Sequence, residues 1–306
     1  MGTGEIAIPA FQYLVDEGYC PVGLVTQPDR PAGRKRELKA PPIKDLAIAA
    51  GMPVLQPEKV REEGALEAIE ALKPDLIVVM AYGQILPKRL IEMAPMGCVN
   101  LHASLLPKYR GAACIQAAID AGDERTGVTL MHVIPKLDAG DVILSGETPI
   151  GDEDTGGVLH DRLAEVARGV LQAGLPSLLD GTAPRTPQEE MGEISHISKL
   201  GRDDGRIDWS WSADRIERRL RAYDPWPGCF TTYDEGSGPK RLKVFPAETA
   251  EGSGPPGSVV VEDGRIGVYC GNGVLILGAV QADGSRRMPA MDWSRGWRAG
   301  AVTRLD

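Results

Sequence analysis

Three polar residues of this 306-residue chain have the types and spacing that acyl-transfer chemistry requires. Asn100 and His102 end an apolar run in "CVNLHASLLPKYRGAACI", and Asp138 follows in the later stretch "KLDAGDVI". Strand residues two apart leave the same face, so a carboxamide and a neutral imidazole can donate hydrogen bonds to one oxyanion. A carboxylate beside that imidazole can polarise it or accept a proton. The alternatives are a capped strand end for Asn100 and His102, and simple turns for Asp138 and Asp141.

The sequence lacks the residues that a nucleophilic, metal-binding or dinucleotide-binding site would need. Between Cys98 and Ile115 there is no Ser or Cys with a flanking base and no G-x-S-x-G turn. His102 has no second ligand at zinc spacing, and the five scattered cysteines form no C-x-x-C pair, so we expect neither a metal site nor disulfides. "GTGEIA" (Gly2 to Ala7) matches a dinucleotide-binding pattern, but only Met1 precedes it where a strand is required, which disfavours NAD binding. A sheet without its first strand is unusual, so we expect the natural start to lie upstream of Met1.

The candidate residues need a scaffold, and the first half of the chain alternates buried strands with amphipathic helices. The strand patterns cover Pro21 to Thr26, Pro74 to Ala81 and Gly97 to His102, and the helix patterns cover Ile43 to Ala50 and Ala65 to Leu72. This alternation predicts βαβ units in a Rossmann-like, doubly wound parallel sheet. Such folds form their sites at the carboxyl ends of strands, which is where Asn100 and His102 lie.

The length of the chain favours two domains. We assign residues 1–180 to the Rossmann-like catalytic domain. The polar, breaker-rich residues 181–204 are typical of a linker. In residues 205–306, one helix pattern precedes short strand patterns separated by Gly-rich turns, which predicts a small, OB-like β-barrel.

The composition, 42 % apolar and 25 % charged, is that of a globular protein. No apolar run reaches the roughly 20 residues that span a bilayer, and no secretory signal is evident, so we expect a cytoplasmic protein without a membrane partner. A formal net charge of -9 opposes non-specific binding of nucleic acid, so a polyanionic partner must meet local basic patches. Two patches occur, in "DRPAGRKRELK" (Asp29 to Lys39) and in the helix pattern "RIERRLR". The alternative for the first patch is a solvated charged loop.

Over nearly its whole length the sequence resembles the tetrahydrofolate-dependent formyltransferases. The resemblance rests on the joint presence of "TQPDRPAGRKRELKAPPIK", "VVMAYGQILPK", "NLHASLLPKYRGAACIQ", "LDAGDVI" and "RIDWSWSADRIERRLRAYDPWPG". Ala103 and Cys114 depart from the family pattern, and both lie beside the polar set rather than in it.

The resemblance implies transfer of the formyl group of 10-formyltetrahydrofolate to the free α-amino group of initiator methionyl-tRNA, without a metal and by a monomer. Asn100 and His102 would stabilise the tetrahedral oxyanion, while Asp138 would orient His102 and remove the proton of the amine. The implied folate-binding residues are Tyr82, Gly83, Gln84, Ile85, Ser104, Leu105, Leu106 and Pro107. The implied tRNA-binding residues are Arg30, Arg34, Lys35, Arg36, Lys39, Arg215, Arg218 and Arg219.

Three alternatives remain open. A formyltransferase acting on a nucleotide-linked amino sugar would share "HASLLPKYRG", but the basic loop from Arg30 to Lys39 argues against it. A folate-binding hydrolase would use Asn100, His102 and Asp138 with water in place of the amine. A non-catalytic RNA-binding protein built on a barrel would not need these three residues to converge.

Overall fold

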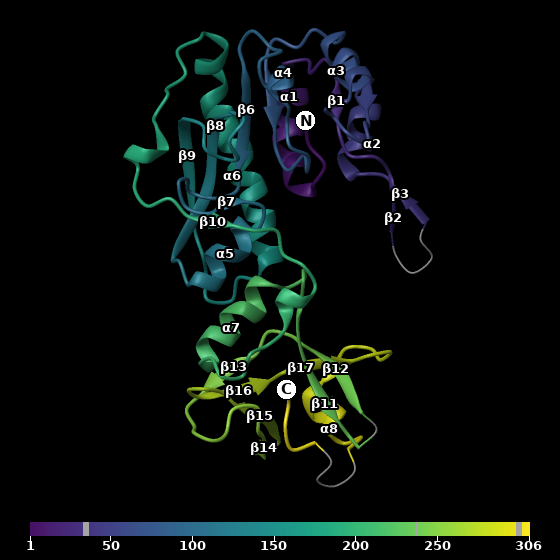
Figure 1. Cartoon of the computed structure of the whole chain (residues 1–306), viewed down its shortest axis with the longest axis vertical. Coiled ribbons are helices and arrows are strands. Elements are labelled where there is room, and N and C mark those ends of the chain that lie inside the picture. Colours follow the sequence, from purple (N-terminus) through teal and green to yellow (C-terminus); the bar gives the residue numbers. More distant parts are fainter. Residues whose placement is uncertain (33–36, 237, 298–301) are drawn as a thin grey trace. The chain divides into compact units, whose positions relative to one another are not determined.

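A computed structural model of the protein describes residues 1–32, 37–236, 238–297 and 302–306, and it divides into two compact units (Figure 1). Unit 1 comprises Met1–Cys114, Arg125–Pro149 and His160–Ile197. Unit 2 comprises Ile115–Glu124, Ile150–Leu159 and Ser198–Asp306. Unit 1 therefore includes the greater part of the segment that the sequence predicted to be a linker.

The strands of unit 1 form a mixed sheet. β5 (Ile77–Val79) pairs in parallel with β6 (Cys98–His102), β6 pairs antiparallel with β8 (Arg125–His132), and β8 pairs antiparallel with β9 (Val142–Pro149). The prediction of an all-parallel sheet is therefore wrong for β8 and β9. These two strands form a hairpin, and a hairpin reverses the chain without the crossover helix that parallel neighbours need.

Two further strands, β1 (Leu24–Val25) and β4 (Val54–Leu55), pair in parallel, and the first residues of the chain connect them to β5. Gly2 forms a parallel bridge with Met80; Gly2 N donates to Val25 O, and Met80 N donates to Met1 O. Met1 and Gly2 thus lie between β1 and β5, at the place where the sequence analysis found no strand pattern. The glycine at position 2 fits this position because a Cβ there would lie 3.0 Å from the Met80 carbonyl oxygen.

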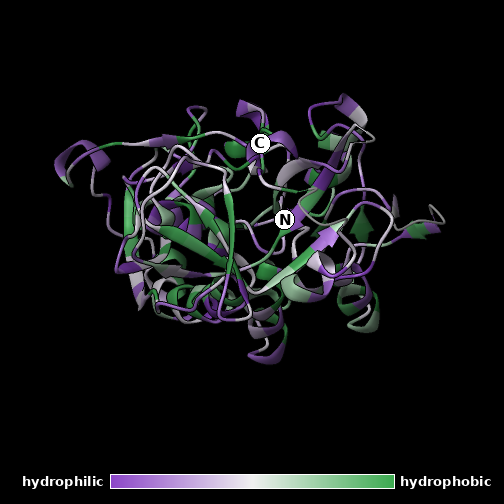
Figure 2. Cartoon of the chain, turned by 90° about the horizontal axis from the view of Figure 1, so that it is seen from below, coloured by the Kyte–Doolittle hydropathy of each residue, from purple (hydrophilic) through white to green (hydrophobic). Residues whose placement is uncertain are grey.

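The helices of unit 1 follow the amphipathic segments of the sequence. They are η1 (Glu5–Ala7), α1 (Ile8–Asp16), α2 (Pro42–Ala49), α3 (Glu63–Glu70), α4 (Lys88–Ile91) and most of α6 (Gly156–Leu179). Leu66, Ile77, Leu90 and Cys98 share one buried cluster of α3, α4 and the sheet. In Figure 2 several strands are largely hydrophobic, whereas many of the loops are hydrophilic.

Unit 1 also contains a short hairpin, a short pair of parallel strands and a single helical turn. β2 (Arg30–Ala32) and β3 (Glu37–Lys39) form an antiparallel hairpin. β7 (Arg110–Gly111) pairs in parallel with β10 (His196–Ile197). η2 (Gln188–Glu190) is a single turn that precedes β10.

Unit 2 contains two four-stranded antiparallel sheets. The first has the order β11 (Cys229–Asp234), β12 (Pro239–Val244), β17 (Ala279–Ala282), β18 (Met288–Pro289). The second has the order β13 (Glu248–Ala250), β16 (Val274–Leu277), β15 (Arg265–Tyr269), β14 (Val259–Glu262). The described residues show these as separate sheets and not as one closed barrel.

The helices of unit 2 include the one that the sequence predicted after the linker. They are η3 (Asp203–Gly205), α7 (Ala213–Ala222), α8 (Ala290–Ser294) and most of α5 (Cys114–Ala121). Ser212 caps α7, because its side chain accepts a hydrogen bond from Arg215 N. None of the helices in the described parts of either unit is both long and apolar enough to cross a membrane.

Candidate functional site

Strand β6 brings Asn100 and His102 to one face of the sheet of unit 1. Asn100 lies between Val79 on β5 and Met131 on β8, and His102, two residues later, lies opposite Thr129. His102 is the last residue of β6 and is buried, whereas Asn100 is half-buried. Within the described part of the chain, the Asn100 side chain makes no hydrogen bond. The carboxyl end of β6 thus carries a carboxamide and an imidazole, as the sequence predicted.

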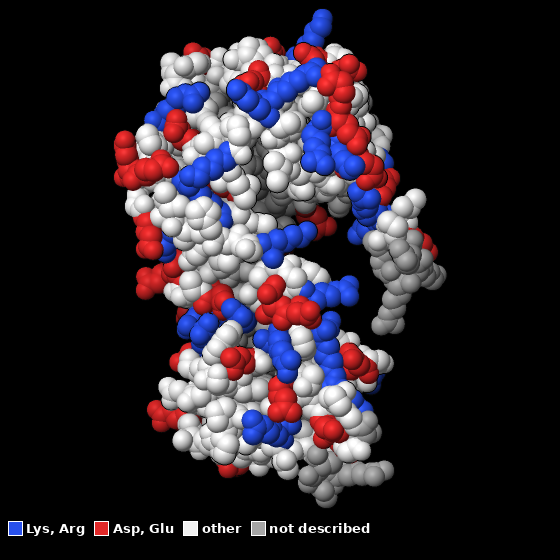
Figure 3. All heavy atoms as spheres, in the orientation of Figure 1, with Lys and Arg blue, Asp and Glu red and all other residues white. Residues whose placement is uncertain are grey.

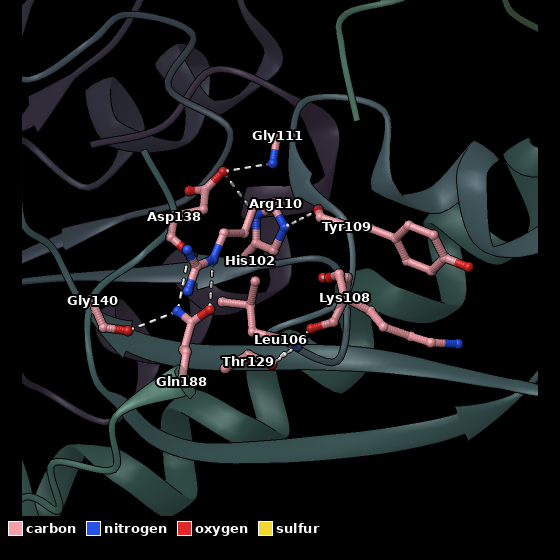
Figure 4. A network of polar contacts seen from close by, with 11 residues as sticks. His102, Leu106, Lys108, Tyr109, Arg110, Gly111, Thr129, Asp138, Gly140 and Gln188 are labelled. Atoms are coloured by element: carbon pink, nitrogen blue, oxygen red, sulfur yellow. Dashed lines mark hydrogen bonds and ion pairs between the residues drawn. The ribbon is translucent and has the colours of Figure 1, made fainter. Parts of the chain in front are cut away.

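The imidazole of His102 lies between a carbonyl and a carboxylate (Figure 4). Nε2 is 2.9 Å from Tyr109 O, and Nδ1 is 3.8 Å from Asp138 Oδ2. Because a carbonyl oxygen only accepts, Nε2 carries the hydrogen of the neutral ring and Nδ1 faces the carboxylate. A neutral His102 in this orientation therefore cannot donate from Nδ1, and a protonated one can.

Asp138 is brought to His102 by the loop between β8 and β9. Its Oδ2 accepts a hydrogen bond from Gly111 N at 2.9 Å. The backbone of Asp138 is left-handed, with a φ of 46°, a conformation that costs a residue other than glycine roughly 1 kcal/mol or more. Asp141 in the same loop lies 3.9 Å from Arg185 and accepts a backbone hydrogen bond from His132, in agreement with a turn role.

The turn Ser104 to Pro107, which the resemblance assigns to folate binding, is held by the side chain of Thr129. The Thr129 hydroxyl donates to Ser104 O at 2.7 Å and accepts from Leu106 N at 3.1 Å. The Ser104 hydroxyl donates to Lys108 O at 2.7 Å. Ser104, Leu106 and Pro107 are buried, and Leu105 is half-buried. The Ser104 hydroxyl therefore stabilises the turn itself.

The second predicted folate segment, Tyr82 to Ile85, is tied to unit 1 by its first and third residues. Tyr82 O accepts hydrogen bonds from Thr3 and Gln27, and burial raises the pKa of the Tyr82 phenol to about 12. Gln84 Oε1 accepts from Val60 N at 2.8 Å. Gly83 and Ile85 are exposed, and Ile85 is 84 % exposed. These two residues form the accessible surface of the segment.

The basic loop of unit 1 is described only in part. Arg34, Lys35 and Arg36 lie outside the described residues. Arg30 pairs with Glu58 at 2.7 Å, and Lys39 is exposed. At the base of the hairpin, Lys44 donates to Asp29 at 2.8 Å, and this hydrogen bond lowers the pKa of the Asp29 carboxyl. Figure 3 shows a hollow in the face of unit 1, with basic side chains along its edges.

The three arginines of α7 that the resemblance assigns to tRNA binding have different surroundings within unit 2. Arg215 is exposed, and its guanidinium lies 3.7 Å above the ring of Trp211. Arg219 pairs with Asp120 of α5 at 2.7 Å, and Arg218 Nε donates to Asp120 O. The charge of Arg219 is therefore already compensated within the protein, whereas Arg215 presents its charge to solvent.

Sequence reasoning missed several residues that hold the site together. They are Tyr109, Arg110, Gly111, Thr129, Gln188 and Ser195. The first three belong to the motif that carried the prediction, but the backbone contacts of Tyr109 and Gly111 and the partner of the Arg110 side chain leave no pattern in a sequence. Gln188 and Ser195 fall in a polar segment that has no chemical motif. Among the described residues, no group of three or more His, Cys, Asp or Glu side chains could hold a metal ion.

The fold and the site define a class of protein: an α/β domain with an Asn, His and Asp set at a strand end, followed by an antiparallel β unit. Family models agree with this class. The formyl transferase model matches residues 14–175, and the model of the formyl transferase C-terminal domain matches residues 199–298. The chain therefore belongs to the formyl transferase family, which confirms the resemblance found in its motifs.

Curated relatives are similar over nearly the full length. The methionyl-tRNA formyltransferase of Akkermansia muciniphila is 51% identical over 293 residues, 94% of this chain and 92% of the relative. That of Citrifermentans bemidjiense is 44% identical over 97% of this chain and 92% of the relative. That of Bacillus licheniformis is 42% identical over 97% of this chain and 93% of the relative.

Two solved structures share the fold at low identity. WlaRD, a sugar 3N-formyl transferase crystallised with dTDP and 5-N-formyl-THF, has a TM-score of 0.65 at 15% identity and covers 93% of this chain and 97% of its own. HypX from Aquifex aeolicus, in complex with tetrahydrofolic acid, has a TM-score of 0.56 at 22% identity and covers 75% of this chain and 40% of its own.

Proposed function

We propose that the protein transfers the formyl group of 10-formyltetrahydrofolate to the free α-amino group of initiator methionyl-tRNA, which gives N-formylmethionyl-tRNA for translation initiation. The observation that carries this proposal is the 51% identity to a methionyl-tRNA formyltransferase over 94% of the chain. The pairing of His102 with Asp138 at the end of β6 supports it, because the resemblance had assigned catalysis to these residues.

The chemistry follows from the three side chains. The neutral amine attacks the formyl carbon, a C–N bond forms, and the carbonyl oxygen becomes a tetrahedral oxyanion. The Asn100 carboxamide donates a hydrogen bond to that oxygen, and His102 would donate a second one from Nδ1 in the form of the ring that carries a hydrogen on both nitrogens. Asp138 accepts the proton that the amine sheds and passes it to N10 of tetrahydrofolate as the bond between the formyl carbon and N10 breaks. An α-amine titrates near neutrality, so the enzyme acts chiefly by positioning and by stabilising charge.

The folate and tRNA contacts are part of the same proposal. The folate would be bordered by two segments, Tyr82 to Ile85 and Ser104 to Pro107. In the first segment, the exposed residues Gly83 and Ile85 would contact it. The basic loop from Arg30 to Lys39 and Arg215 of α7 would contact tRNA phosphates. We further propose that the two antiparallel sheets of unit 2 are parts of an OB-like barrel, and that the protein acts as a cytoplasmic monomer without a metal.

The acceptor decides between this function and formylation of a nucleotide-linked amino sugar. Enzyme and 10-formyltetrahydrofolate are offered methionyl-initiator tRNA and a UDP-linked 4-amino sugar in separate reactions. We expect formylation of the tRNA alone, and formylation of the sugar alone would overturn the assignment. Reversing the charges of Arg34, Lys35 and Arg36 to Glu should raise the KM for tRNA. The matched control, Lys88→Glu, reverses an exposed charge on α4 of unit 1 and should leave that KM unchanged.

A further inference from the structure

Both partners of the His102 ring belong to residues with left-handed backbones. Nε2 faces the carbonyl oxygen of Tyr109, which has a φ of 61°, and Nδ1 faces the carboxylate of Asp138, which has a φ of 46°. Neither residue is glycine, so each conformation must be held by contacts elsewhere. The orientation of the imidazole therefore depends on whatever holds these two backbones.

One segment, Thr186 to Ile197, contacts both loops, and we name it the strap. At its beginning, Thr186 and Val142 exchange backbone hydrogen bonds of 2.9 and 3.0 Å, and Gln188 Nε2 donates to the carbonyls of Asp138 and Gly140 at 3.0 and 2.8 Å. These bonds fix the Asp138 loop on the side away from its carboxylate.

The end of the strap holds the Tyr109 loop. Ser195 Oγ accepts a hydrogen bond from Tyr109 N at 2.8 Å, and Ser195 O accepts one from Arg110 N at 2.9 Å. β10 then pairs with β7, and the two lie side by side in Figure 1. The two strands approach so closely that a Cβ on Gly111 would overlap the carbonyl oxygen of Ile197.

A buried arginine fixes the direction of the Gln188 amide. Arg110 is 1% exposed, and its Nε donates to Gln188 Oε1 at 2.9 Å (Figure 4). Because the amide oxygen is taken by this donor, the amide nitrogen must face the two carbonyls. Gln188 is fully buried, so its hydrogen bonds to Arg110 and to the Asp138 carbonyl form away from water.

We propose that the strap is a positioning element for formyl transfer, in which Gln188 acts through Asp138 and Ser195 acts through Tyr109 to orient His102. The inference rests on the proposed function for its kinetic consequence, and on the contacts alone for its structural consequence. It gives this segment a part in catalysis beyond that of a linker between domains.

The structural consequence is tested with Gln188→Glu. The new carboxylate still accepts from Arg110, but it cannot donate to the carbonyls of Asp138 and Gly140. In a crystal structure of the variant we expect Asp138 to leave the left-handed region and to lose its bond to Gly111 N. An unchanged Asp138 would overturn the proposal, whether or not the protein formylates tRNA. If Gln188→Glu fails to fold, Gln188→Met, which also lacks the donor, is used in the same comparison.

The kinetic consequence is tested with a double-mutant cycle. We expect Gln188→Glu to lower kcat for formyl transfer to methionyl-tRNA about 10 to 100-fold, with the KM for both substrates changed less than about 2-fold, because small misplacements of reacting groups have effects of this size. In an Asp138→Ala background Gln188→Glu should lower kcat no further, because the side chain through which Gln188 acts is already absent. A full additional loss in that background would show a merely structural role and overturn the proposal. Glu190→Gln, an exposed change in the same turn, is the matched control and should leave kcat unchanged.

Ser195 offers a rescue test. Ser195→Ala removes the acceptor of Tyr109 N and should lower kcat about 10-fold, whereas Ser195→Thr keeps the hydroxyl and should restore it. An inactive wild type would refute the proposed function but leave the crystallographic test of the strap intact. Equal activity of Ser195→Ala and wild type would refute the role of Ser195.

Discussion

We predict that the Thr129 hydroxyl stabilises the turn that follows β6, and a single substitution tests this. Thr129 is fully buried, and its hydroxyl donates to Ser104 O and accepts from Leu106 N. Thr129→Val keeps the shape of the side chain, leaves both backbone groups without a partner and also removes the 3.0 Å hydrogen bond between Thr129 and the exposed Ser145 hydroxyl. Each orphaned buried group costs about 1–3 kcal/mol, and the added methyl returns about 0.8 kcal/mol. We therefore expect a net loss of about 1 to 5 kcal/mol in the free energy of unfolding.

Thermal unfolding measures this loss. At about 2–4 °C per kcal/mol for a unit of this size, a loss near 3 kcal/mol lowers Tm by about 6–12 °C. Two controls isolate the hydroxyl. Thr126→Val makes the same change at a buried position of β8 where, in the described part of the chain, the side chain makes no hydrogen bond. Thr129→Ser keeps the hydroxyl and loses only the methyl. If Thr129→Val and Thr126→Val unfold at the same temperature, the hydroxyl does not hold the turn.

Three further predictions concern charge. Burial and nearby Arg185 lower the pKa of His132, so protonation favours the unfolded chain and stability is lost as the pH falls below about 6.5. His132→Gln should therefore lose less stability than wild type between pH 7 and pH 5 in thermal unfolding, and parallel curves would contradict this. Arg219→Ala leaves the half-buried Asp120 carboxylate without its cation and should lower Tm, whereas Arg215→Ala should leave Tm nearly unchanged. If Arg215 contacts a phosphate, Arg215→Ala should also reduce the slope of log affinity for tRNA against log salt by about 0.9, and an unchanged slope would exclude that contact.

Local patterns predicted the elements of the fold well. β1, β5 and β6 fall inside the predicted apolar runs, and α7 begins directly after the serine that caps it. Strand direction was harder, because an apolar run looks the same in a parallel and an antiparallel pair. The antiparallel β8 and β9 follow from the short connection between them, which the sequence displayed but the all-parallel prediction ignored.

The residues of the candidate site that lie in family motifs could be predicted from the sequence. The residues that reach the site from distant parts of the sequence could not. His102 and Asp138 were anticipated from the family motifs, and the structure brings them together. Gln188 could not be anticipated, because its role arises from hydrogen bonds to loops that lie far away in the sequence. Helix α7 shows the same limit: the sequence placed Arg219 in a basic patch, and only the fold reveals its pairing with Asp120.

Single-turnover formyl transfer from 10-formyltetrahydrofolate to methionyl-initiator tRNA, measured for wild type and His102→Ala together with their tRNA affinities, is the most direct test of the whole account. We expect rapid transfer by the wild type, a loss on the order of 100-fold or more in the variant, and equal affinity for tRNA. A wild type that transfers nothing would contradict the proposed function, and a variant as fast as the wild type would contradict the site.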